Sequence, residues 1–398
     1  MKTNNNIPAY RFQGFEDDWE EVKLGEVLVE YNKKSEIENQ FELLSSTNSG
    51  IEPRSGRVSG ESNIGYKIIK RGMVVLSPQN LWLGNINYNA KFEIGIVSPS
   101  YKVFNINGPN ELYLATVLRL PKMFFEYAQA SVQGASIVRR NLDLDLFGSI
   151  LVQLPSFPEQ TAIGTFFSTL DRHITLHQRK LDKLKEQKKT YLKLLFPAKG
   201  QTQPALRFQG FEDDWEEVKL GEVLIKNSKR NKDLRIINVE SVSNRLGFVK
   251  QTEQFEDYSV ASSDLSNYYV ISEKQFAYNP SRINVGSIAY KKLGEESSVV
   301  SPLYVSFSTS ENVEDYYLWY WFKTELFHSQ RIVFSEGGVR DTLSYNQLSE
   351  IILSLPSLPE QEVIGTFFST LDQEIAQVED KLASLKEMKK TLLRKLFV

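Results

Sequence analysis

The feature that most constrains this chain is an internal repeat. Leu154–Phe196 matches Leu355–Phe397 at 27 of 43 positions without a gap. Pro8–Leu28 recurs as Pro204–Leu224 with a single difference. Because a period of about 200 residues is too long for the stacked units of a solenoid, the repeat predicts two whole domains.

The parts of the chain between the repeated segments have diverged. Val29–Gln153 and Ile225–Ser354 share only landmarks, such as Val97-Ser-Pro-x-Tyr101 and Val300-Ser-Pro-x-Tyr304. Both parts mix short β-branched and aromatic runs with Gly, Pro, Asn and Ser, which is typical of strands and turns. We therefore predict an α+β fold with two similar mixed α/β domains.

Both copies of the longer repeated segment have a coiled-coil pattern. Apolar side chains follow alternating steps of four and three over more than four heptads, and Pro158 and Pro359 suit a first helical turn. About 37 residues at 1.5 Å each would make helices about 55 Å long. The pattern predicts two long helices that pair as an antiparallel coiled coil. The pairing residues are Ile163, Phe167, Leu170, Ile174, Leu181 and Leu184 in the first copy and Ile364, Phe368, Leu371, Ile375, Val378, Leu382 and Leu385 in the second.

These patterns divide the chain into four segments. We predict globular domains at residues 1–153 and 198–354, and spacer helices at residues 154–197 and 355–398. Two domains separated by two paired helices would form a pseudo-twofold tandem repeat. Within the domains, Glu111–Gln129 is expected to be helical with a break at Pro121.

Composition excludes several classes of protein. The chain has no cysteine, so it can form neither a disulfide nor a thiolate metal site. Met1–Tyr10 lacks the pattern of a leader, and no apolar run is long enough to span a bilayer. We therefore expect a cytoplasmic protein that does not bind a membrane.

The net charge of −3 hides local patches of opposite sign. Arg11–Glu30 has two basic and seven acidic residues, whereas Leu154–Phe196 has eight basic and four acidic ones. Lys274–Lys292 has four basic residues and no acidic one. A surface that faces DNA depends on such local potential more than on the sum.

The chain lacks the usual catalytic motifs. It has no Gly-x-x-x-x-Gly-Lys-[Ser/Thr] loop and no Gly-x-Gly-x-x-Gly fingerprint. His173 and His177 have the spacing of metal ligands on a helix, but Val378 replaces the second histidine in the other copy, which indicates a packing position. We therefore predict no catalytic residue and no metal site.

The repeated motifs resemble those of the specificity subunit of type I restriction–modification enzymes. They are the Pro-Ala-x-Arg-Phe-x-Gly-Phe…Trp opening, the Leu-Pro-x-x-Pro-Glu-Gln helix entrance, and the Ile-Gly-x-Phe-Phe-x-x-Leu-Asp helix with its lysine-rich end, each present twice. The resemblance covers essentially the whole chain. It implies that each diverged domain is a target recognition domain for one half of a split, asymmetric site in double-stranded DNA.

The resemblance also implies partners and cofactors. The paired helices would set the gap between half-sites and help to dock two modification (methyltransferase) subunits, and restriction (motor–nuclease) subunits would then join. This chain would bind no cofactor itself. S-adenosylmethionine would belong to the modification subunits, and ATP and Mg to the restriction subunits.

Two matching turns hold the main candidates for base contacts, because amide side chains suit adenine and arginine suits guanine. The alternative is that their polar residues serve only the turn. A second pair of loops ends in basic residues that could contact phosphate or form ion pairs, and several lysines are phosphate candidates or ordinary surface. The candidates are Gln79, Asn80, Trp82, Asn85, Ser281, Arg282, Asn284 and Ser287 in the turns, Gln133, Ser136, Arg139, Arg140 and Arg340 in the loops, and Lys67, Lys70, Lys91, Lys291 and Lys292.

A different class of function stays open at this point. The chain could be a coiled-coil adaptor that binds only proteins and has no DNA specificity. Its acidic segments Glu16–Glu30 and Glu212–Glu222 would then be the docking surfaces.

Overall fold

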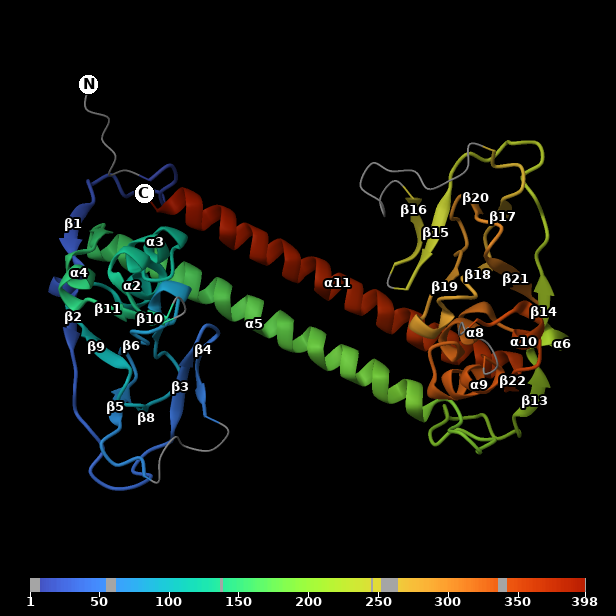
Figure 1. The fold of residues 1–398 in the computed structure, drawn as a ribbon, viewed down its shortest axis with the longest axis horizontal. Helices are drawn as coiled ribbons and strands as arrows, with labels where there is room; N and C mark the ends of the chain where they lie inside the picture. The colour runs from blue at the N-terminus through green and yellow to red at the C-terminus, as the bar shows by residue number, and fades with distance from the viewer. Residues whose placement is uncertain are drawn as a thin grey trace. The chain divides into compact units, whose positions relative to one another are not determined.

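The computed structural model describes residues 8–54, 62–136, 139–244, 246–251, 264–335 and 342–397, with the backbone alone for residues 132–136, 139 and 140. Contacts divide the chain into two compact units (Figure 1). Unit 1 is Met1–Gln178 with Asp380–Val398, and unit 2 is Arg179–Glu379. Each unit therefore contains one globular domain and one part of each long helix.

The two long helices are α5 (Phe157–Leu194) and α11 (Leu358–Leu396). They lie inside the segments predicted as spacer helices, and the predicted α+β fold of two similar domains is confirmed. Because each helix contributes to both units, the contacts do not reproduce a division into four segments, which stays a prediction.

Unit 1 contains a four-stranded antiparallel sheet in the order β2-β9-β6-β7, and the pairs β1-β12, β3-β4, β5-β8 and β10-β11. Helices α2 and α3 are separated at Pro121, as predicted. The elements are β1 (Glu20–Lys23), α1 (Leu24–Val27), β2 (Leu28–Glu30), β3 (Leu44–Thr47), β4 (Gly50–Pro53), β5 (Lys67–Lys70), β6 (Val74–Leu76), η1 (Leu81–Leu83), β7 (Ile86–Tyr88), β8 (Ile94–Val97), β9 (Lys102–Ile106), α2 (Glu111–Val117), α3 (Pro121–Gln129), β10 (Ser131–Ser136), β11 (Arg139–Leu142), α4 (Leu144–Ser149) and β12 (Leu151–Leu154).

Unit 2 repeats this topology. Its four-stranded sheet has the order β14-β21-β18-β19, and its strand pairs are β13-β22, β15-β16 and β17-β20. The elements are β13 (Glu216–Lys219), α6 (Leu220–Val223), β14 (Leu224–Lys226), β15 (Glu240–Ser243), β16 (Gly247–Lys250), β17 (Tyr269–Ile271), β18 (Phe276–Tyr278), η2 (Ile283–Val285), β19 (Ile288–Tyr290), β20 (Ser298–Val300), β21 (Val305–Thr309), α8 (Asp315–Trp321), α9 (Glu325–Ser335), α10 (Tyr345–Ser349) and β22 (Ile352–Leu355).

One of the two inner strands of each four-stranded sheet, β6 or β18, is buried on both faces. Val74 and Leu76 of β6 pack in the main core, whereas Val75 points to a second cluster with Leu44 and Val97. Successive side chains of a strand point to opposite faces, so a continuous apolar run is what such a strand requires. In unit 2, β18 has the same arrangement, with Phe276 and Tyr278 in the main core and Ala277 on the other face.

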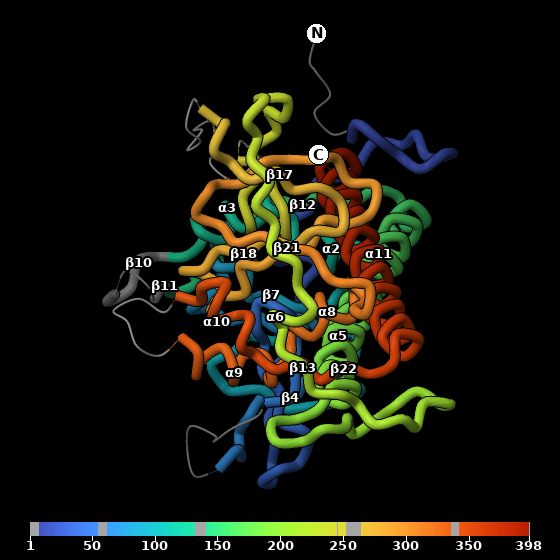
Figure 2. The backbone as a smooth tube through the Cα atoms, turned by 90° about the vertical axis from the view of Figure 1, so that its right-hand side faces the viewer, coloured from blue at the N-terminus to red at the C-terminus, as the bar shows by residue number. Residues whose placement is uncertain are grey.

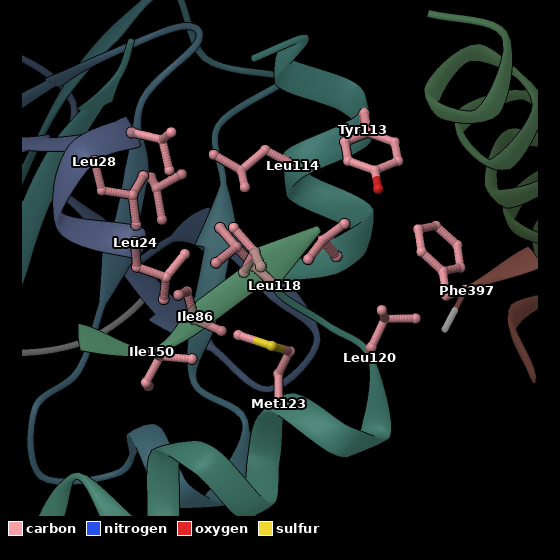
Figure 3. Close-up of a cluster of buried hydrophobic side chains, with 14 of the residues drawn as sticks. Leu24, Leu28, Ile86, Tyr113, Leu114, Leu118, Leu120, Met123, Ile150 and Phe397 are labelled. Carbon is pink, nitrogen blue, oxygen red and sulfur yellow. The ribbon is translucent and has the colours of Figure 1, made fainter. Parts of the chain in front are cut away.

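The main core of unit 1 joins α2 to the sheet and to the end of α11 (Figure 3). Tyr113 of α2 is fully buried, and its ring centroid lies 5.8 Å from that of Phe397. In unit 2, Tyr317 of α8 lies 5.3 Å from Phe196 at the end of α5. The aromatic residues of α8 are mainly core residues.

A buried ion pair fixes the first turn of each long helix. Glu159 is fully buried and accepts hydrogen bonds from Arg11 Nε at 2.9 Å and Nη2 at 2.6 Å. Glu360 accepts the same two bonds from Arg207 at 2.9 and 2.7 Å. Hydrogen bonding to these carboxylates raises the pKa of both arginines. The repeated opening segment thus ties each domain to the helix that follows it.

The helix segments pair antiparallel inside each unit, and Figures 1 and 2 show them side by side. In unit 1, Asp171 of α5 accepts from Lys389 Nζ of α11 at 2.5 Å. Its counterpart in unit 2 is the ion pair of Asp372 and Lys188. The residues predicted to pair the helices are buried or partly buried, and several of them also belong to the main cores of the two units, so their pairing role stays a prediction: Ile163, Phe167, Leu170, Ile174, Leu181, Leu184, Ile364, Phe368, Leu371, Ile375, Val378, Leu382 and Leu385.

Candidate nucleic-acid interface

Two short loops in equivalent places carry most of the predicted base contacts. In unit 1, η1 lies between β6 and β7, and in unit 2, η2 lies between β18 and β19. Each 3-10 helix ends at a left-handed glycine, Gly84 with φ 88° and Gly286 with φ 82°. The glycine N–H donates to the carbonyl of the first 3-10 residue at 2.7 and 3.0 Å, respectively. Since other residues are strained at such φ values, these glycines fix the same turn twice.

The two loops present different side chains on this shared backbone. Unit 1 offers amide groups beside a partly buried indole, whereas unit 2 offers a guanidinium, an amide and a hydroxyl. Amides match the donor and acceptor of adenine, and the guanidinium matches the acceptors of guanine. The predicted contacts that lie in solvent are Gln79 and Asn80 in unit 1 and Ser281, Arg282 and Asn284 in unit 2, with Trp82 partly buried.

The prediction is wrong for the last residue of each loop. Asn85 is buried, accepts from Ser46 Oγ at 2.7 Å and donates to the Ser46 carbonyl at 2.9 Å. Ser287 is buried and donates to the Val242 carbonyl at 3.0 Å. Both side chains anchor a neighbouring hairpin, so they offer no group to bound DNA.

Two of the phosphate candidates are buried as well, so we do not retain them. Lys67 Nζ lies 3.9 Å from Glu30 Oε1, and burial lowers the pKa of Lys67. Lys291 is 2% exposed and donates to Glu240 Oε2 at 2.6 Å and to Ser298 Oγ at 3.1 Å. Burying an ammonium group is costly unless it is paired, so these lysines serve the folded core.

The remaining lysine candidates are at the surface. Lys70, Lys91 and Lys292 are exposed, and Lys91 Nζ lies 4.8 Å from the centroid of the Phe92 ring. Their role as phosphate contacts stays a prediction.

The second pair of loops is described in part, by the backbones of β10 and β11. The backbones of β10 and β11 pair with a register shift between Gln133 and Ser136. The side chains of Gln133, Ser136, Arg139 and Arg140, and the whole of Arg340, lie outside the described residues.

One exposed cation that the sequence did not single out lies beside the first loop. Arg119 follows α2, and its Nη1 donates to Asn87 Oδ1 at 2.5 Å while Nη2 donates to the Asn48 carbonyl at 3.0 Å. It therefore joins β7 to the turn of the β3-β4 hairpin. Its only sequence signal was the equivalent cation Lys323 after α8.

The described residues contain no group of three or more His, Asp or Glu side chains placed to hold a metal ion. Among them, His177 lies on α5 with Nδ1 2.9 Å from the His173 carbonyl oxygen. In the described part of the chain, no helix has both the length and the apolar character needed to cross a membrane.

Known proteins are similar to this chain over nearly its whole length. The Type I restriction enzyme MjaVIII specificity subunit of Methanocaldococcus jannaschii is 22% identical over 411 residues, which covers 95% of this chain and 91% of that subunit. The crystal structure of the S subunit of the type I restriction–modification system from M. genitalium superposes with a TM-score of 0.63 at 14% identity, covering 98% of this chain and 99% of that one. At this identity the superposition establishes a shared fold.

A family description confirms the resemblance inferred from the repeated motifs. The type I restriction modification DNA specificity domain matches residues 16–186 and again residues 212–387. The two matches cover most of the chain, and each corresponds to one copy of the internal repeat. This chain therefore belongs to the type I restriction–modification DNA specificity family and carries the family's domain twice.

Proposed function

We propose that unit 1 and unit 2 each recognise one half of a bipartite, asymmetric sequence in double-stranded DNA. The observation that carries this proposal is the pair of η loops, which share their backbone and differ in their exposed side chains. Two identical recognition domains would favour a palindromic DNA site. Two different domains held by the same repeated segments favour an asymmetric site.

The long helices are proposed to set the gap between the half-sites. Helix α5 has 38 residues and is about 57 Å long at 1.5 Å per residue, which exceeds one DNA turn of about 34 Å. A helix of this length suits a run of base pairs that neither domain reads.

As a family member, the chain supplies DNA specificity in a complex in which other subunits carry the catalytic sites. We propose that two modification subunits dock on it, because the segments that flank each globular domain are repeated and offer the same surface twice. In this proposal, S-adenosylmethionine is held by the modification subunits, ATP and Mg belong to restriction subunits that join later, and the complex acts in the cytoplasm. The adaptor without DNA specificity is not favoured, because the matched domain is a DNA specificity domain.

The test is to exchange one globular domain. The chain is expressed with its modification subunit, and the methylated sequences in the host DNA are determined by methylation-sensitive sequencing. Replacing the unit 1 domain by that of a relative with another target should change one half-site and leave the other half-site and the gap unchanged. Retention of the original full site by the hybrid would contradict the proposal.

A further inference from the structure

Each unit carries a two-stranded hairpin that forms a separate small sheet. In unit 1, β3 pairs with β4, and the Thr47–Gly50 pair closes a turn made of Asn48 and Ser49. In unit 2, β15 pairs with β16, and Ser243–Gly247 is the last pair of the register. In the sequence, two residues separate the partners of the last pair in unit 1, and three separate them in unit 2.

Both hairpins are anchored to the η loops by the same contact. The residue after the left-handed glycine donates to the third residue of the first hairpin strand: Asn85 Nδ2 to the Ser46 carbonyl at 2.9 Å, and Ser287 Oγ to the Val242 carbonyl at 3.0 Å. In unit 1, Asn87 Nδ2 also donates to the Thr47 carbonyl at 2.7 Å. The hairpin turn is therefore held close to the loop that carries the predicted base contacts.

The tips of the hairpins are exposed and differ between the units. Asn48 and Ser49 are exposed in unit 1, as are Asn244 and Leu246 in unit 2. Leu246 is 77% exposed, so it contributes little to the core. The anchoring contacts are thus alike, whereas the tips differ in both length and chemistry.

We propose that these two hairpins are a second set of base-reading elements, which enter the major groove as two-stranded ribbons beside the η loops. The inference rests on the proposed function and extends it to named residues. The major groove is wide enough for a two-stranded β-ribbon, which a separate two-stranded sheet provides. At the tips, the amide of Asn48 suits an adenine, and the apolar side chain of Leu246 suits the methyl group of a thymine.

The experiment measures base discrimination by single substitutions at the tips. Asn48→Ala and Leu246→Ala are assembled with the modification subunit, and binding is measured on duplexes that carry each single-base change in the two half-sites. Asn48→Ala should lower discrimination about tenfold at one or two positions of one half-site, and Leu246→Ala should do so in the other half-site. Asn107→Ala and Leu293→Ala are matched controls, because these residues are also exposed but lie outside the hairpins.

The outcomes separate this inference from the proposed function. If the wild-type complex discriminates between bases and both tip variants keep its full discrimination, the hairpin inference is overturned and the proposed function stands. If a tip variant weakens binding equally on all duplexes, the tip contacts the backbone and the base-reading role is overturned. If the wild-type complex shows no base preference, the proposed function fails, and the inference fails with it.

Discussion

Unit 1 and unit 2 join the long helices to their globular domains at equivalent positions, but some of the side chains at these positions differ. In unit 1, Gln160 Oε1 accepts from the Asn110 N–H at 2.8 Å, and in unit 2, Gln361 Oε1 accepts from the Glu314 N–H at 2.9 Å. These two bonds join each long helix to the start of α2 or α8. The helix cap itself differs, an asparagine in one unit and a glutamate in the other.

The buried ion pairs show a second difference of this kind. Trp215 Nε1 donates to Glu360 Oε2 at 3.1 Å, whereas the buried Nε1 of Trp19 has no hydrogen-bond partner among the described residues. An unpaired buried donor costs free energy. The comparison teaches that identical sequence in the repeated segments does not guarantee identical hydrogen bonding.

The largest expected effect is the loss of a buried ion pair. Glu159→Gln and Glu360→Gln should each lower the free energy of unfolding by about 3–5 kcal/mol, because each leaves a partly buried arginine without its counter-charge. Glu360→Gln should cost about 1 kcal/mol more, because it also weakens the bond from Trp215. Denaturation followed by tryptophan fluorescence measures both values.

The control for this pair is Glu350→Gln, which removes an exposed ion pair with Lys219 and should change stability little. If Glu159→Gln and Glu360→Gln lowered the free energy of unfolding equally, the extra contribution expected from the Trp215 hydrogen bond would be contradicted.

A smaller effect is expected where the long helices approach α2 and α8. A Cβ added at Gly164 would lie 2.5 Å from Tyr113 N and 2.9 Å from Leu112 C, which are backbone atoms. At Gly365 the nearest atom, at 2.5 Å, is Glu314 Oε2, the end of a flexible side chain, followed by Tyr316 Cβ at 2.9 Å, and the backbone atom Tyr317 N is farther away at 3.0 Å. Gly164→Ala should therefore cost about 2 kcal/mol, and Gly365→Ala about 1 kcal/mol, in the free energy of unfolding.

Thr165→Ala is the matched control for the glycine variants, since Thr165 is exposed on the next position of α5. A larger loss for Gly365→Ala than for Gly164→Ala would show that the backbone of α2 yields more readily than the Glu314 side chain.

The smallest effect concerns the two different helix caps. Burial raises the pKa of Glu314 above its ordinary value. The folded state therefore holds the proton more tightly than the unfolded state, so the stabilising contribution is present below the unfolded pKa and is lost as the pH rises through the folded pKa. Glu314→Asn, which copies Asn110, should gain stability relative to wild type between pH 4 and pH 7, by less than about 1 kcal/mol. A constant difference across this range in denaturant titrations would contradict the prediction.

Much of the fold could be predicted because its signals are local and repeated. The heptad pattern located both long helices, and Pro121 marked the break between α2 and α3. The candidate site was harder, as Asn85 shows. A small polar residue in a turn can face solvent or the protein, and its partner, Ser46, lies 39 residues earlier in the chain.

By itself, the amino-acid sequence determined that this protein contains two copies of one unit. The repeated segments at the ends of each unit are nearly identical, and the parts between them have diverged. The reason is physical: periodic apolar residues specify helices and strands through short-range geometry. Only the tertiary structure decided which polar residues of the diverged parts stay in solvent. It buried Asn85, Lys67, Ser287 and Lys291 against hairpins and carboxylates, because a polar group can leave water when a partner compensates it.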